Sequence, residues 1–319
     1  MAQTLKLEDL EIMRTLGTGA FGRVRIARVK ATGEFIALKS LKKQHIIRTK
    51  QVDHVASEHH ILRITNHPFL VNLKGFCQDP SYLYFGMEFV PGGDLFTYLR
   101  KVGKFDSTQA MLFAGQISLM FEYLHSMNII YRDLKPENLL INADGYLKLT
   151  DFGFAKIVEE RTYTLCGTPE YIAPEVLLNK GHYKPVDWWT LGVIIYEMLA
   201  GIDPFNDDDP MLIYQKILKC KYQFPRNFDT HAKSLVKHLL VIDLSKRYGN
   251  LKKKAEDIKR HRWFKNLDWD ELVNKNIKMP YVPFLPSAGD TSHFVEYPDS
   301  YSNAPALNSA HDPFINWNS

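Results

Sequence analysis

The stretch Tyr131–Asn138, with the sequence YRDLKPEN, and the tripeptide Asp151–Gly153, with the sequence DFG, decide the fold. Two apolar runs lie between them and are separated by Ala143–Gly145, with the sequence ADG. An Asp-Gly pair between apolar arms is a strong signal for a β-hairpin. Because antiparallel pairing brings the outer ends of two arms together, Asn138 and Asp151 are predicted to lie at adjacent strand ends.

The polar side chains around this hairpin suit phosphoryl transfer. Oxygens of Asn138 and Asp151 can coordinate one hard cation, Mg²⁺, that bridges the phosphates of ATP. Asp133 is placed to orient and deprotonate a hydroxyl, and Lys135 to neutralise charge on the transferred group. The alternative is that all four are incidental loop residues, and the combined loop and hairpin context argues against it.

A glycine-rich loop comes earlier in the chain. Gly17–Gly22 has the sequence GTGAFG, and its glycines let backbone N–H groups approach a phosphate closely. The strand-like alternation of residues 23–26 disfavours a dinucleotide-binding fold, and the Gly-Lys-Ser/Thr of a Walker loop is absent. We therefore predict a strand–loop–strand flap over ATP, with Lys39 meeting the phosphates and Val24 and Ala37 beside the adenine.

Glu58 supports this interpretation of Lys39. A helix is predicted over about residues 44–65, and Glu58 lies on its buried-side stripe, from which it can hold Lys39 by an ion pair. The alternatives are a surface lysine at a strand end and an ordinary solvated glutamate.

Composition and charge exclude several classes of protein. The 319 residues are 45% hydrophobic with a net charge of +4, which excludes a disordered or collagen-like chain. Three scattered cysteines exclude a disulfide framework and a Cys-x-x-Cys zinc site. The basic run 252–262 is interrupted by Glu256 and Asp257, which favours a solvated helix face over a nucleic-acid surface. With neither a signal-peptide core nor an apolar run of ~20 residues, we expect no membrane segment and a cytoplasmic and nuclear location.

The remaining pattern predicts an α+β protein of two lobes. Strands are expected over 7–40, 70–76 and 82–90, followed by helical spacing from 95 to 264 and a proline-rich extended tail. The four predicted parts are a β-rich lobe with one long helix at 1–87, a hinge at 88–94, a mostly helical lobe at 95–267, and a tail over both lobes at 268–319.

The sequence resembles the protein kinases from the glycine loop through Ala173–Glu175 to Arg247. Within that family, Thr164–Tyr171 (TLCGTPEY) and Gly289–Phe294 (GDTSHF) are similar to the AGC-group catalytic subunits of cAMP-dependent protein kinase. The resemblance implies a bilobal serine/threonine kinase that uses ATP and two Mg²⁺ ions. It also implies protein substrates, a cyclic-nucleotide-binding regulatory subunit and pseudosubstrate inhibitors as partners.

The resemblance also assigns residues to the ATP site. It makes Met87 the gatekeeper, places Glu88–Val90 on the adenine and Phe294 over it, and has Asp187 brace the catalytic loop and Glu175 pair with Arg247. The residues expected to contact ATP are Leu16, Gly17, Thr18, Gly19, Ala20, Phe21, Gly22, Val24, Ala37, Lys39, Met87, Glu88, Val90, Asp94, Glu137, Asn138, Leu140, Thr150, Asp151 and Phe294.

Activation and substrate choice are assigned by the same resemblance. Thr164 is expected to carry a phosphate that pairs with Arg132, Lys156 and His54, and the alternative is a solvent-facing threonine in a flexible loop. Four acids are expected to attract arginines before the target serine or threonine, unless they are separately solvated, and three residues to line a pocket for the apolar residue after it. The acids are Asp94, Glu137, Glu170 and Glu197, and the pocket residues are Leu165, Pro169 and Ile172.

Three further expectations concern the tail and the competing functions. Phe314 and Trp317 resemble a terminal aromatic motif that docks on the small lobe. Asp94, one methylene shorter than the glutamate usual in the family, predicts looser selection three residues before the acceptor. The rival functions are a pseudokinase scaffold and a piece of a longer chain such as a cyclic-GMP-dependent kinase.

Overall fold

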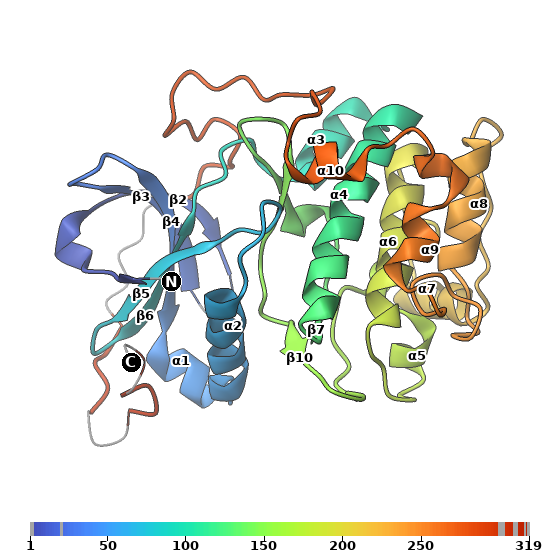
Figure 1. Ribbon diagram of the computed structural model, residues 1–319. Helices are drawn as coiled ribbons and strands as arrows, with labels where there is room; N and C mark the ends of the chain where they lie inside the picture. Colours follow the sequence, from blue (N-terminus) through green and yellow to red (C-terminus); the bar gives the residue numbers. More distant parts are fainter. Residues whose placement is uncertain (1–2, 20–21, 299–303, 309–311, 316, 318–319) are drawn as a thin grey trace.

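The computed structural model describes residues 3–19, 22–298, 304–308, 312–315 and 317, and its elements form two lobes (Figure 1). A six-stranded sheet with two helices makes the small lobe, and the large lobe is mainly helical. The α+β, bilobal class predicted from the sequence is confirmed. The residue limits assigned to the four parts of the chain stay predictions.

The sheet of the small lobe has six strands, of which β2, β3 and β4 follow one another as antiparallel neighbours. Its strand order is β1-β5-β6-β4-β3-β2, in which β1 is parallel to β5 and the other neighbours are antiparallel. The strands are β1 (Gln3–Thr4), β2 (Leu10–Thr18), β3 (Gly22–Val29), β4 (Phe35–Lys42), β5 (Leu73–Gln78) and β6 (Tyr82–Glu88). The strand predicted to start at residue 70 starts at Leu73, because the N–H of Val71 donates instead to the carbonyl of Leu149 in the large lobe.

Gly22 is required by the packing of the sheet as well as by the loop. It pairs with Leu41 of β4, and a Cβ atom at Gly22 would lie 1.7 Å from the carbonyl oxygen of Ser40. Backbone cannot move aside as a flexible side chain can, so only glycine lets β3 start this close to β4. The last glycine of the loop therefore fixes where the flap is anchored.

The prediction of a single helix over residues 44–65 is wrong, because the structure contains two helices there. They are α1 (Lys43–Arg48) and α2 (Val52–Ile64). The Thr49 hydroxyl donates to the His45 carbonyl at 2.7 Å, and Lys50 takes a left-handed φ of 57°. A hydroxyl that bonds to the preceding turn and a left-handed residue end a helix without glycine or proline.

The large lobe is built around two buried helices. In α6 (Pro185–Ala200) every residue from Pro185 to Met198 is buried, and α4 (Ser107–Ser126) packs against it. Asp106 caps the start of α4 by accepting from the N–H of Gln109. Among the described residues, no helix combines the length and apolar character that crossing a bilayer requires. The other helices are α3 (Leu95–Val102), α5 (Pro174–Leu177), α7 (Pro210–Leu218), α8 (Thr230–Leu239), α9 (Ala255–Lys259) and α10 (Trp269–Val273).

Short elements complete the fold. Two small sheets pair β8 (Leu139–Ile141) with β9 (Leu147–Leu149), and β7 (Ile129–Ile130) with β10 (Lys156–Ile157). The 3₁₀ turns are η1 (Leu7–Asp9), η2 (Pro136–Asn138), η3 (Pro169–Tyr171) and η4 (Arg262–Phe264).

The tail returns from α10 to the small lobe (Figure 1). Near its end Trp317 stacks on His59 of α2 at a ring distance of 4.1 Å, and the carbonyl of Phe314 accepts from Gln78 of β5. Lys43, which is 1% exposed, donates to Asp312 at 2.7 Å. The predicted docking of the terminal aromatic residues on the small lobe is therefore confirmed.

Candidate active site

The hairpin between the two sequence motifs forms as predicted. Leu139 pairs with Leu149, and the N–H of Thr150 donates to the carbonyl of Asn138 at 2.9 Å. The ends of the two strands therefore bring Asn138 next to the residue before Asp151. The turn chemistry of the Asp-Gly pair, a local signal, was sufficient to predict this long-range arrangement.

Asn138 and Asp151 fit a magnesium ion by the chemistry of their oxygens. The amide nitrogen of Asn138 donates to the backbone carbonyl of Asp133 at 2.9 Å, which leaves the amide oxygen as the candidate ligand. Asp151 has a φ of 58° and a side chain that is 53% exposed, and one of its oxygens lies 3.9 Å from Lys39. In the described part of the chain no group of three or more His, Cys, Asp or Glu residues could hold a metal. A cation here would need phosphate oxygens to complete its shell, as Mg²⁺ in nucleotide sites does.

Asp133 lies in a hydrogen-bonded cluster beside this pair. One carboxylate oxygen accepts from Thr168 at 3.2 Å, and the other accepts from the side chain of Asn138 at 3.1 Å and lies 3.4 Å from Lys135. Burial raises the pKa of Asp133, an effect that Lys135 and Thr168 only partly offset. A carboxylate held in this way has the orientation and the raised proton affinity of a general base.

Asp187 of α6 holds the catalytic loop from below. Its side chain is fully buried, and its two oxygens accept from the backbone N–H groups of Tyr131 at 3.0 Å and Arg132 at 2.9 Å. His125 contacts the same carboxylate at 2.7 Å. The expected brace is confirmed, and it fixes the two residues that precede Asp133.

Lys39 and Glu58 form the predicted ion pair at 2.6 Å. Burial lowers the pKa of Lys39, but the charges of Glu58 and Asp151 outweigh that effect and raise it. The lysine therefore stays charged close to Asp151, the candidate metal ligand. In the loop above, the N–H of Gly19 donates to the carbonyl of Gly22 at 2.9 Å, whereas Ala20 and Phe21 lie outside the described residues.

The residues predicted around the adenine belong to two apolar clusters. Leu16, Val24 and Phe294 pack in one small cluster together with Phe89, whose ring lies 6.0 Å from that of Phe294. Phe89 lies within the hinge range Glu88–Val90 that was expected on the adenine, although it was not singled out among the residues that contact ATP. The other predicted adenine contacts pack in or against the main core, and they are Ala37, Met87, Val90 and Leu140. Ala37 of β4 pairs with Met87 of β6 across the sheet.

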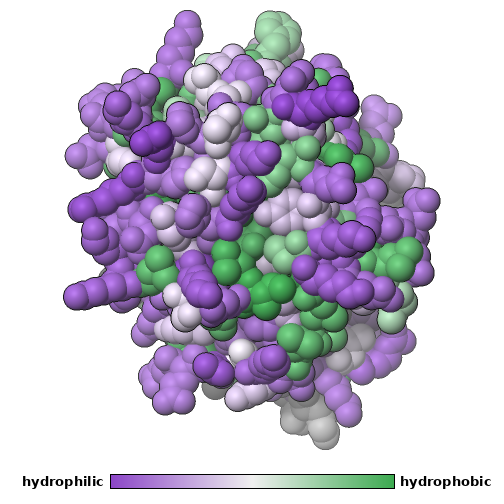
Figure 2. Space-filling model, turned by 90° about the vertical axis from the view of Figure 1, so that its right-hand side faces the viewer, coloured by the Kyte–Doolittle hydropathy of each residue, from purple (hydrophilic) through white to green (hydrophobic). Residues whose placement is uncertain are grey.

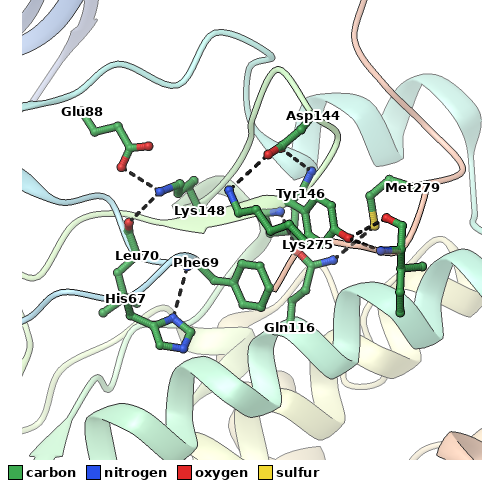
Figure 3. A network of polar contacts seen from close by, with 12 residues as sticks. His67, Phe69, Leu70, Glu88, Gln116, Asp144, Tyr146, Lys148, Lys275 and Met279 are labelled. Atoms are coloured by element: carbon green, nitrogen blue, oxygen red, sulfur yellow. Dashed lines mark hydrogen bonds and ion pairs between the residues drawn. The ribbon is translucent and has the colours of Figure 1, made fainter. Parts of the chain in front are cut away.

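A buried ion pair behind the hinge was not predicted (Figure 3). Lys148 of β9, which is 3% exposed, donates to the carboxylate of Glu88 at 2.7 Å and to the carbonyl of Leu70 at 3.3 Å. The same carboxylate accepts from the side-chain amide of Asn72 at 3.3 Å. Burial lowers the pKa of Lys148, and Glu88 opposes this effect. The pair ties the hinge to the strand that leads into Asp151.

The acids predicted to choose substrates are only partly free to do so. Glu197 is 1% exposed and accepts from Tyr171 at 2.6 Å and Arg100 at 3.2 Å. Burial, together with the nearby charges of Asp203 and Glu137, raises the pKa of Glu197 to about 7, although Tyr171 and Arg100 oppose this shift. Glu170 in turn raises the pKa of Asp203. Glu137, Glu170, Glu197 and Asp203 therefore form one acidic region, and Asp203 is the member that the sequence did not predict.

Asp94 has a structural role that the sequence interpretation did not assign. Its two oxygens accept from the N–H and the hydroxyl of Thr97, so it is the N-cap of α3. An aspartate directly before an apolar periodic run is a typical helix start, and this signal was present in the sequence. Three residues were predicted to line a pocket for an apolar substrate residue. In the structure Leu165 is exposed, Pro169 is half-buried and Ile172 is buried.

The cations expected around Thr164 are not gathered on it. Thr164 is exposed, while Lys156 donates to Thr162 at 3.3 Å and His54 contacts Gln51 at 2.6 Å. Arg132 donates through Nε to the carbonyl of Phe154, and its Nη1 is buried without a partner in the described residues. The assignment of Thr164 as a phosphosite stays a prediction.

A second predicted pair lies farther from the cleft. Arg247 donates through its two terminal nitrogens to Glu175 at 2.6 and 2.9 Å, and both side chains are buried. This bidentate ion pair joins α5, just after the activation segment, to the core of the large lobe, as the resemblance implied.

Comparison with known proteins agrees with this geometry. Residues 10–264 match the protein kinase domain family. The chain is 53% identical over 293 residues to cAMP-dependent protein kinase catalytic subunit 3 of Drosophila melanogaster, covering 92% of this chain and 50% of that protein. It is 52% identical over 294 residues to cAMP-dependent protein kinase catalytic subunit PRKX of Mus musculus, covering 92% and 83%. It is 48% identical over 298 residues to cAMP-dependent protein kinase type 3 of Saccharomyces cerevisiae, covering 93% and 75%.

The chain belongs to the protein kinase family, and its domain is that of an ATP-dependent serine/threonine protein kinase that uses Mg²⁺. Within the family it is similar to catalytic subunits of cAMP-dependent protein kinase, so the resemblance seen in the sequence is confirmed. The chain spans half the length of the Drosophila relative and most of the mouse one.

The buried pair behind the hinge yields a prediction about ATP binding. Lys148→Met leaves the Glu88 carboxylate, whose side chain is 23% exposed, without its cation, and the loss of a partner for a partly buried charge costs about 1–3 kcal/mol. Because Glu88 lies where adenine is expected, the KM for ATP should rise roughly fivefold, equivalent to ~1 kcal/mol, with little change in kcat. Steady-state kinetics and thermal melting measure the two effects.

Lys275→Met is the matched control for this variant. Lys275 makes an ion pair at the edge of the same network with Asp144, whose side chain is 42% exposed, and an exposed pair contributes little. Lys148→Gln should recover part of the loss, because an amide can still donate to Glu88. If Lys148→Met and Lys275→Met bind ATP equally well, the pair has no part in setting the hinge.

Proposed function

We propose that this chain is an active kinase that phosphorylates serine or threonine in Arg-Arg-x-Ser/Thr-apolar sequences under the control of a cyclic-nucleotide-binding subunit. The observation that carries the activity is the cluster in which Asn138, Thr168 and Lys135 surround the carboxylate of Asp133. A pseudokinase scaffold could lose any of the catalytic groups, whereas here Lys39, Glu58, Asp133, Asn138 and Asp151 are all present.

Asp133 is the residue that would take the proton of the acceptor hydroxyl. Hydrogen bonds from Asn138 and Thr168 orient its carboxylate, and its raised pKa makes it a stronger base than an exposed aspartate. Lys135, 3.4 Å away, can neutralise charge on the group in transfer.

Lys39 would position the phosphates of ATP under the glycine-rich loop. The Glu58 carboxylate fixes its ammonium group from one side, and Asp151 lies on the other. A Mg²⁺ ion held by Asn138 and Asp151 would supply neutralisation of phosphate charge; the use of two such ions is part of the proposal. Positioning and electrostatics account for most of the catalysis in phosphoryl transfer.

The test of the activity is phosphate transfer from ATP to an Arg-Arg-x-Ser peptide. We expect Asp133→Ala to lower kcat by roughly 10²-fold or more, because the base and its orienting contacts are lost. Asp144→Ala in the nearby hairpin turn makes the same chemical change outside the cluster, and it should retain nearly all activity. Equal rates for Asp133→Ala and the wild type would remove Asp133 from the mechanism.

The acidic region of the large lobe supports a preference for arginine. Glu137, Glu170 and Asp203 lie near enough to Glu197 or to one another to shift pKa values. The cation that Glu197 now holds, Arg100, has a side chain that is 45% exposed, so a substrate guanidinium can replace it without a large rearrangement. Burial makes such a pair stronger than a surface ion pair.

The raised pKa of Glu197 predicts a dependence of KM on pH. The carboxylate binds a guanidinium only when ionised, and its pKa is about 7 in the free protein. The KM for an Arg-Arg-x-Ser peptide should therefore rise as pH falls from 8 to 6, approaching about tenfold per unit below the pKa. Steady-state kinetics across that range measures the effect.

Glu197→Gln is the control for this pH dependence. An amide cannot titrate, so its KM should be high at every pH and should lack the rise assigned to Glu197. The titration of Asp133 would change kcat instead, which separates the two groups. If KM and its pH profile are the same in both proteins, Glu197 does not recognise the substrate.

Control by a regulatory subunit is supported by the relatives, which are named as catalytic subunits of cAMP-dependent protein kinase. We expect a purified regulatory subunit of that kinase to inhibit peptide phosphorylation and cAMP to relieve the inhibition. Inhibition relieved only by cGMP, or no inhibition, would end the cAMP assignment and leave the kinase assignment intact. A cytoplasmic and nuclear location likewise stays a prediction.

A further inference from the structure

A polar cavity of about 610 Å³ lies at the end of the large lobe, between α8, α9 and η4. Figure 1 places these elements at the end of the molecule opposite the small lobe, and Figure 2 faces that end, where hydrophilic side chains cover most of the surface. Its size is that of a small-molecule pocket. Every lining side chain is polar or aromatic: Thr230, His231, Ser234, His238, Tyr248, Lys253, Asp257, Arg260, His261 and Arg262.

The hydrogen bonds around Ser234 define which groups remain free to bind. The N–H of Trp263 donates to Nδ1 of His261, so the hydrogen of that ring is on Nε2, which donates to the Ser234 hydroxyl at 3.1 Å. Burial lowers the pKa of His261 to about 4, and it is neutral at physiological pH. Because the Ser234 oxygen accepts, its own hydrogen remains to be donated to an occupant. His238 donates through Nδ1 to the Ser234 carbonyl at 2.8 Å.

The charges of the lining favour an anion. Lys253 precedes α9, and Arg260 and Arg262 follow it, against Asp257 alone, so cations exceed acids by 3 − 1 = 2. Arg260 is paired with Glu256 at 3.0 Å. Within the described part of the chain, Lys253 and Arg262 make no ion pair. Two unpaired cations in the lining of one cavity suit a ligand with more than one anionic group.

Asp257 adds a second requirement. One of its carboxylate oxygens is buried and has no donor among the described residues. A buried acceptor without a partner is costly, and a hydroxyl group of an occupant would satisfy it. A phosphate cannot do so, because phosphate oxygens at neutral pH are chiefly acceptors. The described residues offer no group of His, Cys, Asp or Glu able to hold a metal, which removes that occupant.

We propose that this cavity binds a small phosphorylated polyol. Lys253 and Arg262 bind its phosphates, the Ser234 hydroxyl donates to one of them, and Asp257 accepts from a free hydroxyl. The concave shape and small volume distinguish the site from the extended positive surface that nucleic acids need, and the acids within residues 252–262 interrupt such a surface.

The test is calorimetric titration of the full chain with myo-inositol 1,4,5-trisphosphate, which carries phosphates and keeps free hydroxyls, with the ATP site filled by a nucleotide-competitive inhibitor. We expect one site per chain and at least about tenfold weaker binding by Lys253→Glu/Arg262→Glu, which corresponds to ~1.4 kcal/mol. Lys252→Glu/Lys265→Glu is the matched control, because it reverses two neighbouring exposed lysines outside the lining and changes the net charge equally. It should bind within about twofold of the wild type.

A second arm separates the polyol from phosphate alone. Inorganic pyrophosphate presents phosphates without hydroxyls, so Asp257→Asn should strengthen pyrophosphate binding by removing a like charge. The same substitution should weaken binding of the inositol phosphate, because the ligand hydroxyl then loses the carboxylate that accepts from it. The site is overturned if the wild type does not bind, or if the control pair loses as much affinity as the cavity pair. If both probes respond equally to Asp257→Asn, or if a phosphopeptide displaces the inositol phosphate at lower concentration, the polyol assignment is wrong.

Peptide phosphorylation provides an independent control. Neither Lys253 nor Arg262 contacts the catalytic cluster, so Lys253→Glu/Arg262→Glu should keep the wild-type rate within about twofold, and unchanged melting would show that the fold is intact.

Discussion

The catalytic geometry depends on the buried carboxylate of Asp187. It lies in the middle of the large lobe without exposure to solvent and receives the N–H groups of Tyr131 and Arg132 and a contact from His125. Arg132 has a φ of 71°, a conformation that costs a non-glycine residue about 1 kcal/mol or more. Charge-assisted hydrogen bonds at low dielectric are strong enough to hold it there. The position of Asp133 follows from that constraint, because it is the next residue.

The tail carries the same kind of constraint from one lobe to the other. Tyr146, in the hairpin of the large lobe, donates to the carbonyl of Ile277. Farther on, Arg14 of β2 donates to Thr291 at 3.1 Å, and the ion pair of Lys43 with Asp312 lies at the far side of the small lobe. A segment fixed to both lobes on either side of the hinge limits how far the cleft can open. The adenine cluster depends on it as well, because Phe294 comes from the tail.

Local signals made much of the site predictable from sequence. The Asp-Gly turn predicted that Asn138 lies beside Asp151. Alternation of side chains along a strand placed Lys39, the buried face of the predicted helix placed Glu58, and together they predicted the ion pair. What could not be predicted lacks such a signal. Lys148 alternates with leucines in β9, as an exposed strand residue would, and only the approach of the hinge buries it. The break after α1 depends on a threonine hydroxyl, which competes with helix only weakly in most contexts.

Burial opposes the charged forms of Lys39, Asp133 and Glu197, and the partners of each group decide which of them remain available for function. Glu58 and Asp151 keep Lys39 charged despite desolvation. Both terminal nitrogens of Arg247 donate to the two carboxylate oxygens of Glu175. The Glu175–Arg247 pair is saturated in this way and maintains the structure, whereas Lys39 is kept charged for the phosphates of ATP. The groups that would meet ligands have unused capacity instead, as do the amide oxygen of Asn138, the second oxygen of Asp151 and the buried Nη1 of Arg132. Glu197 is intermediate, because Arg100, the cation that pairs with it, has a side chain that is 45% exposed and would give way to a substrate arginine in the proposed function. The free oxygens of Asn138 and Asp151 are therefore the groups that would bind metal and phosphate, because the fold has not already supplied them with a partner.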